Sequence, residues 1–117
     1  MKILLNDKLA LLRENCSQGN WDGDGAHAID DAVFDVAADF VSALPPIIEQ
    51  PLVVAMPEGG LSFEWRKSDD MCLSVGVDKF GELTYAGIFG NDIVYGVDSF
   101  SGILPGRVLD LILRVFV

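Results

Sequence analysis

Residues 52–97 read LVVAMPEGGLSFEWRKSDDMCLSVGVDKFGELTYAGIFGNDIVYGV, and this stretch decides the expected fold. From residue 61 onward, apolar and polar side chains alternate, which is the period of a strand with one buried face. Short turns rich in Gly and Asp separate the alternating segments, and such turns join antiparallel strands because parallel strands need a longer crossover. The stretch therefore predicts an antiparallel meander of four to five strands. The residues expected to face the core are Leu61, Phe63, Trp65, Leu73, Val75, Leu83 and Tyr85.

Two helices are expected before this sheet. Residues 6–16 repeat apolar side chains at three- and four-residue spacing, and Asn6 is a residue type favoured at a helix N-cap. A glycine-rich loop follows at 17–28, and Asp30 suits the N-cap of a second helix. Pro45 and Pro46 end that helix, because a residue before proline avoids the helical region. The apolar stripe of the second helix is expected to consist of Val33, Val36, Ala37, Phe40 and Leu44.

The end of the chain allows two interpretations. Residues 108–117 are rich in β-branched side chains and alternate tolerably, as a strand would. Pro105 suits the first position of a helix, and Arg107, Asp110 and Arg114 would share one helical face, so we favour a helix. The chain 1–117 is thus expected to form a single α+β domain. It would have two N-terminal helices, the meander and a C-terminal helix, with the helices packed on one face of the sheet.

Charge is distributed unevenly along the chain. Of 117 residues, 18 are acidic and 8 basic, and the formal net charge is −10. No Lys or Arg lies between Arg13 and Arg66, and residues 14–65 hold ten acids, so the whole net charge lies in that stretch. Such a balance disfavours direct binding to a nucleic-acid backbone, which relies on clustered Lys and Arg. It suits a protein partner with a basic surface.

Other features limit where the protein acts. No apolar run approaches the roughly 20 residues that a membrane span needs. Residues 1–5 resemble a signal peptide for only a few positions before Asn6, so we expect a cytoplasmic protein without membrane contact. Cys16 and Cys72 are far apart and fit no metal-ligand spacing, which favours two reduced thiols.

Catalytic patterns are absent from the sequence. His27 is the only histidine, so no paired-histidine metal motif can exist, and no serine lies in a GxSxG turn. We therefore predict no catalytic residue, no cofactor and no enzyme activity, with an enzyme that uses scattered carboxylates as one alternative. A metal-binding or small-ligand domain that uses the acidic loop 20–31 is another alternative. In that case, a partial match to a calcium loop would be provided by Asn20, Asp22, Asp24 and Asp31.

Several short motifs resemble a known group of proteins. The loop Trp21-Asp22-Gly23-Asp24-Gly25-Ala26, the Leu44-Pro45 helix end and the strand Gly60-Leu61-Ser62-Phe63-Glu64-Trp65 carry the resemblance. They are similar to a loose group of small bacterial proteins with a W-D-G-x-G/x-A loop and a G-L-x-F-E-W strand. Genes of that group often lie near toxin–antitoxin or mobile-element genes. The resemblance implies an accessory role and no particular activity.

The sequence thus favours a non-enzymatic acidic module that binds another protein, such as an antitoxin-like, immunity-like or mobile-element accessory protein. Asp31, Asp35 and Asp39 recur every four residues on the second helix and would form an acidic stripe for a basic partner, unless they only keep the protein soluble. Trp21 serves either as a structural plug or as a binding anchor. The candidate contact residues are Trp21, Asp22, Asp24, Asp31, Asp35 and Asp39. The apolar C-terminal helix is expected to pair two copies of the chain, unless it is the centre of the monomer core.

Overall fold

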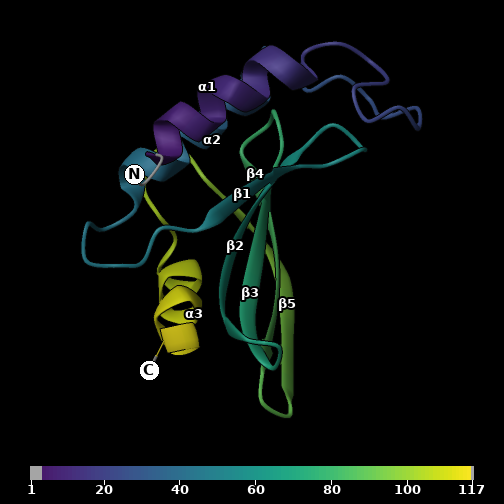
Figure 1. Ribbon diagram of the computed structural model, residues 1–117. Helices are drawn as coiled ribbons and strands as arrows, with labels where there is room; N and C mark the ends of the chain where they lie inside the picture. Colours follow the sequence, from purple (N-terminus) through teal and green to yellow (C-terminus); the bar gives the residue numbers. More distant parts are fainter. Residues whose placement is uncertain (1–3, 117) are drawn as a thin grey trace.

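The computed structural model describes residues 4–116, and the expectations for residues 1–3 and for Val117 lie outside that range. Three helices and one five-stranded sheet form the α+β fold expected from the sequence (Figure 1). The elements in chain order are α1 (Leu5–Cys16), α2 (Asp31–Ala43), β1 (Leu52–Ala55), β2 (Leu61–Ser68), β3 (Met71–Val77), β4 (Glu82–Phe89), β5 (Asp92–Ser99) and α3 (Gly106–Phe116).

The strands form an antiparallel meander in the order β1-β2-β3-β4-β5. Because side chains alternate across a strand, the register places one set of residues toward the helices and the other on the helix-free face. All seven residues expected to face the core are buried. β2 and β3 pair Phe63 with Val75 and Trp65 with Leu73, so the inward residues of neighbouring strands stack.

Aromatic rings join α2 to the sheet. Phe40 of α2 lies 4.9 Å from Phe63, 6.5 Å from Trp65 and 5.7 Å from Phe100, measured between ring centroids. The indole Nε1 of Trp65 donates a hydrogen bond to the backbone oxygen of Glu49 at 2.8 Å, so its one polar atom is satisfied inside the core. The same cluster fixes the segment between α2 and β1 against the sheet.

Of the two helix N-caps expected from the sequence, the structure confirms one. The Asp30 carboxylate accepts a hydrogen bond from the backbone nitrogen of Ala32 at 2.9 Å and caps α2, as expected. The expectation for Asn6 was wrong: α1 begins at Leu5, and the N-cap position is Leu4, which makes no side-chain cap bond. Burial of Leu5 and Leu9 against the core outweighs the gain from an Asn cap, since a cap contributes only about 1 kcal/mol.

The C-terminal segment is a helix, which resolves the ambiguity between helix and strand. α3 starts at Gly106, one residue later than expected, and the carbonyl of Pro105 accepts a hydrogen bond from the backbone nitrogen of Leu109 at 3.1 Å. None of the three described helices is long enough to cross a bilayer, since the longest has 13 residues. The buried side of α3, packed on the sheet, consists of Val108, Leu111, Ile112 and Val115.

Candidate functional site

The acidic loop between α1 and α2 is closed by its own hydrogen bonds. The carboxylate Oδ1 of Asp22 accepts from the backbone nitrogens of Asp24 at 2.8 Å and Ala26 at 3.1 Å. The side-chain oxygen of Asn20 accepts from the nitrogen of Gly25 at 2.7 Å, and Asn20 itself has a positive φ of 61°. Two of the four side chains weighed as metal ligands, those of Asn20 and Asp22, thus accept backbone N–H groups of the loop.

These bonds make the loop sensitive to pH. The N–H of Asp24 and, more weakly, that of Ala26 lower the pKa of Asp22 below its ordinary value of 3.8. Because the folded-state pKa is the lower one, the carboxylate stabilises the fold above the ordinary value, and this contribution is lost as pH falls through the lowered pKa. Among residues 4–116, no group of three or more His, Cys, Asp or Glu side chains is arranged to hold a metal ion.

We expect millimolar calcium to change the melting temperature by no more than about 1 °C, because a ligand stabilises a protein only when it binds the folded state. The Oδ1 of Asp22 and the side-chain oxygen of Asn20 already accept the backbone N–H bonds that close the loop, so an ion at these atoms would compete with those bonds. Thermal unfolding followed by circular dichroism, with magnesium as the matched control, measures this. A calcium-specific rise of several degrees that Asp22→Ala abolishes would contradict the expectation.

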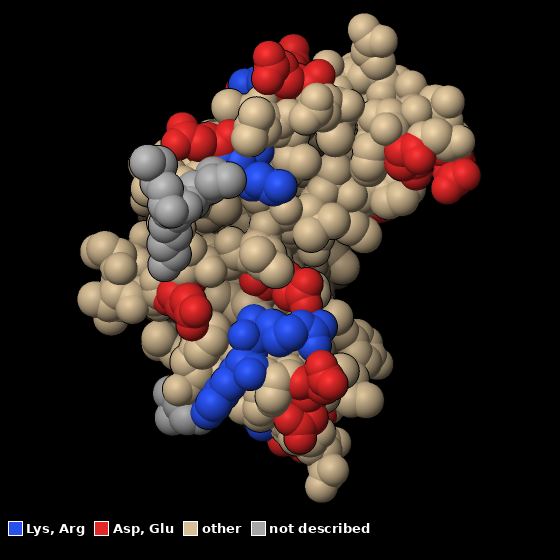
Figure 2. All heavy atoms as spheres, in the orientation of Figure 1, with Lys and Arg blue, Asp and Glu red and all other residues tan. Residues whose placement is uncertain are grey.

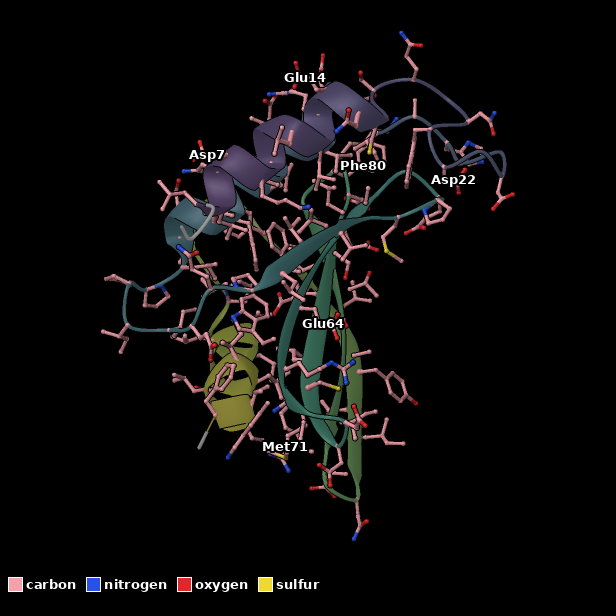
Figure 3. All side chains as sticks on the ribbon, viewed as in Figure 1. Asp7, Glu14, Asp22, Glu64, Met71 and Phe80 are labelled. Carbon is pink, nitrogen blue, oxygen red and sulfur yellow. The ribbon has the colours of Figure 1, made fainter. Side chains whose placement is uncertain are left out.

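Trp21 lies over the core rather than at the loop tip. Its ring is half-buried against the core cluster, and its Nε1 donates a hydrogen bond to the carbonyl of His27 at 2.8 Å. Asp22, in contrast, is exposed and stands at the end of the molecule, where Figure 3 labels it. The arrangement of Trp21 favours a structural plug over a binding anchor, because its polar atom already has a partner.

The acidic stripe on α2 is partly neutralised by α1. Arg13 donates from Nε to Asp31 and from Nη2 to Asp35, both at 3.2 Å, and its guanidinium lies 5.2 Å from the ring centroid of Phe34. Hydrogen bonding to Asp35, and then to Asp31, raises the pKa of Arg13. Two carboxylates of the stripe are therefore engaged within the chain. Asp39 is exposed and joins none of the ion pairs within the part of the chain that the structure describes.

A different group of acids surrounds a cavity at the end of the sheet. This cavity, here called the acidic hollow, has a volume of about 520 Å³ and lies where residues 27–30 meet the β1–β2 and β3–β4 turns. The backbone nitrogen of His27 donates to the carbonyl of Pro57 at 2.8 Å and fastens the first of these segments to the second. The side chains that bear chemistry in the hollow are His27, Asp30, Glu58, Asp78, Lys79, Phe80 and Glu82.

The four carboxylates of the hollow have two different roles. Asp30 caps α2, and the Oδ1 of Asp78 accepts from the backbone nitrogens of Phe80 at 2.8 Å and Glu82 at 3.0 Å, so both are held in place by local structure. Glu58 and Glu82 line the same cavity, and their carboxylates take part in none of the hydrogen bonds described for residues 4–116. The hollow therefore offers two further carboxylates around one cavity.

Phe80 is the aromatic group of the hollow. Its side chain is 83% exposed although it lines the cavity, so it stands at the rim. Figure 3 shows Phe80 toward the same end of the molecule as Asp22, and Met71 at the opposite end. Lys79, the single Lys or Arg of the hollow, places Nζ 5.3 Å from the centroid of the Phe80 ring. The rim therefore already holds a cation against an aromatic face.

Figure 2 shows one face of the molecule: acidic atoms lie over α1 and at the loop tip, and in the lower half a group of basic atoms lies among further acidic ones. The sequence alone did not select Glu58, Phe80 or Glu82. The sequence contained one signal for this site. Phe80 lies inside the turn Lys79-Phe80-Gly81-Glu82, and a large ring in a short turn is expected to stay exposed because it cannot reach the core. Asp22 and Asp24, which were selected, do not line the hollow.

Comparisons with known proteins found no relative: no family model, no curated protein and no solved structure matches the chain. The resemblance to the group of small bacterial proteins therefore stays a prediction.

Proposed function

We propose that this chain is a non-enzymatic, cytoplasmic protein-interaction module that binds an arginine- or lysine-bearing segment of another protein in the acidic hollow. The observation that carries the proposal is the cavity of about 520 Å³ that four carboxylates surround beside an exposed phenylalanine. The proposal keeps the basic partner expected from the sequence. It moves the contact from the α2 stripe to the hollow, because Arg13 already pairs with Asp31 and Asp35.

The chemistry of the hollow suits a guanidinium group. A carboxylate such as that of Glu58 or Glu82 accepts charge-assisted hydrogen bonds, and arginine can donate two in parallel. The Phe80 ring attracts a cation through its quadrupole, and the guanidinium would take the place that the Nζ of Lys79 now holds 5.3 Å from the ring centroid. With four acids and one lysine, and with His27 left out of the count, the formal charge of the lining is −3, so the cavity attracts a cationic segment before contact.

Binding of a short Gly-Ser peptide with two adjacent arginines, followed by fluorescence anisotropy, tests the proposal. We expect the double variant Glu58→Gln, Glu82→Gln to weaken binding about 10-fold or more, since losing one charge-assisted bond costs roughly 1.5–3 kcal/mol. Phe80→Ala should weaken it further. The peptide should also bind less tightly as salt rises, because exposed charges are screened.

A charge-matched control separates the hollow from general acidity. Asp7→Asn with Glu14→Gln removes the same number of charges from α1, where Figure 3 labels both residues, and neither residue lines the hollow. Equal losses for the two double variants, or no binding by the wild-type chain, would contradict the proposal. If only the triple variant of Asp31, Asp35 and Asp39 to Asn loses binding, the α2 stripe is the contact instead. Free arginine that binds as tightly as the peptide would favour the small-ligand alternative.

A further inference from the structure

The strand β5 forms a complete and unguarded edge of the sheet. It pairs with β4 along all eight residues, from Asp92 to Ser99, with no register shift. Its central residues 93–97, with the sequence IVYGV, include no charged residue and no proline. Natural edge strands are usually blunted by lysine, proline, a bulge or a covering element, because their free N–H and C=O groups pair with other strands.

The helix-free face of β5 is apolar and exposed. Ile93, Tyr95 and Val97 are 74%, 80% and 61% exposed, and the register sets them beside Ile88, Ala86 and Thr84 of β4. None of the three described helices packs its backbone on β5, whereas α1 contacts β1, the opposite edge. Arg114 of α3 reaches β5 only at its start, through an ion pair with Asp92 at 2.8 Å. Figure 1 shows β5 on the side of the sheet away from α3.

A second copy of the chain complements this edge better than a basic partner does. The segment 93–97 offers no carboxylate to a cation. It is uncharged in a chain with a net charge of −10, so two copies repel less there than at the acidic surfaces. Antiparallel pairing of β5 with itself around Tyr95 sets Ile93 opposite Val97 of the other copy, twice, on the helix-free face. Asp92 then lies opposite Asp98, and the ion pair with Arg114 offsets that repulsion.

We propose that two copies of this chain pair through β5 in an antiparallel, two-fold arrangement and join their sheets into one continuous sheet. The contact is isologous, so it closes on itself and leaves no further β5 edge free. It differs from the homodimer through the C-terminal helix that the sequence favoured. Four apolar residues of α3 pack in the core of their own chain: Val108, Leu111, Ile112 and Val115. Leu113, at 40% exposure, is the large apolar side chain of α3 that stays exposed for a second copy to contact.

Light scattering on the full chain at micromolar concentrations tests the pairing. We expect twice the chain mass of 12.7 kDa for the wild type and the single chain mass for Tyr95→Lys. Leu113→Lys is the matched control and should leave the mass doubled. A single-chain mass for the wild type, a dimer broken by Leu113→Lys but not by Tyr95→Lys, or open-ended larger assemblies would each overturn the proposal.

Cross-linking reports the register without relying on a variant that weakens the contact. In a Cys72→Ser background, Tyr95→Cys should form a disulfide-linked dimer under mild oxidation, because directly opposite Cβ atoms lie about 4.5–5.5 Å apart. Ser99→Cys, on the same strand but away from the axis, should not. A doubled mass with no cross-link at position 95, or equal cross-linking at both positions, would overturn the two-fold axis at Tyr95.

Discussion

Replacing Trp65 by alanine is expected to lower the free energy of unfolding by about 3–5 kcal/mol, the range typical of a fully buried Trp or Phe truncated to Ala. The Trp65 side chain is 1% exposed, contacts Phe40 and donates a hydrogen bond to the carbonyl of Glu49. Its loss would leave a large cavity between α2 and the sheet and an unpaired carbonyl. Urea unfolding followed by far-UV circular dichroism measures the change.

Two controls separate packing from hydrogen bonding. Trp65→Phe keeps a ring in the core but removes the donor, so it should cost about 1–3 kcal/mol, the penalty for an unpaired buried polar group. Trp21→Ala removes the same side-chain type with the same kind of hydrogen bond from a half-buried position. Trp21→Ala should lower the free energy of unfolding less than Trp65→Ala does. A larger decrease for Trp21→Ala would mean that the loop contributes more to stability than the core around Trp65, which would contradict the expectation.

Gly81→Ala is the second substitution expected to have a large effect. Gly81 lies in the β3–β4 turn with a φ of 79°, and a Cβ added there would meet the carbonyl oxygen of Phe100 at 2.6 Å. Left-handed backbone costs an L-residue about 1–2 kcal/mol and overpacking about 1–3 kcal/mol, so we expect a loss of about 2–5 kcal/mol. The neighbouring backbone cannot yield easily, because the nitrogen of Phe100 donates to the carbonyl of Gly81 at 2.7 Å.

Gly90→Ala provides the matched control. Gly90 also has a positive φ, 66°, but a Cβ there has nothing within 4 Å. It should therefore show only the conformational cost of about 1–2 kcal/mol. Equal losses of unfolding free energy for the two variants would mean that Phe100 moves away freely. Because Gly81 lies beside Phe80, a rigid turn here would also hold the rim of the acidic hollow in position for a partner.

The proposals for the hollow and for β5 use opposite physical properties of the surface. The hollow concentrates carboxylates and one aromatic ring, so its binding should fall as salt rises. The β5 edge is uncharged across residues 93–97, so pairing there should hold or strengthen in salt, which screens the repulsion between two chains of net charge −10. The two contacts lie on different parts of the molecule and can be tested one at a time.

The sequence by itself determined the antiparallel meander, the start of α2 and the inward face of the sheet. Alternation in residues 61–89 placed Leu61, Phe63 and Trp65 toward the core, because a strand with one covered face has a period of two. Asp30 marked the start of α2, because a cap acts on backbone nitrogens only two or three residues away. Strand alternation and helix capping both involve residues that are close in the sequence, so they can be read from the sequence directly.

Only the tertiary structure decided which charged groups meet. Arg13 lies 18 and 22 residues before Asp31 and Asp35, and no period in the sequence links them, so an apparently unopposed acidic stripe has a partner from α1. The acidic hollow likewise joins residues 27–30 to two turns, which residues 58–60 and 78–82 form, because α2 and the meander pack with those segments at one end. Ion pairs and cavities depend on how elements distant in the chain pack together. The apolar pattern within one helix or strand shows which face is buried, but it does not show which element packs against that face.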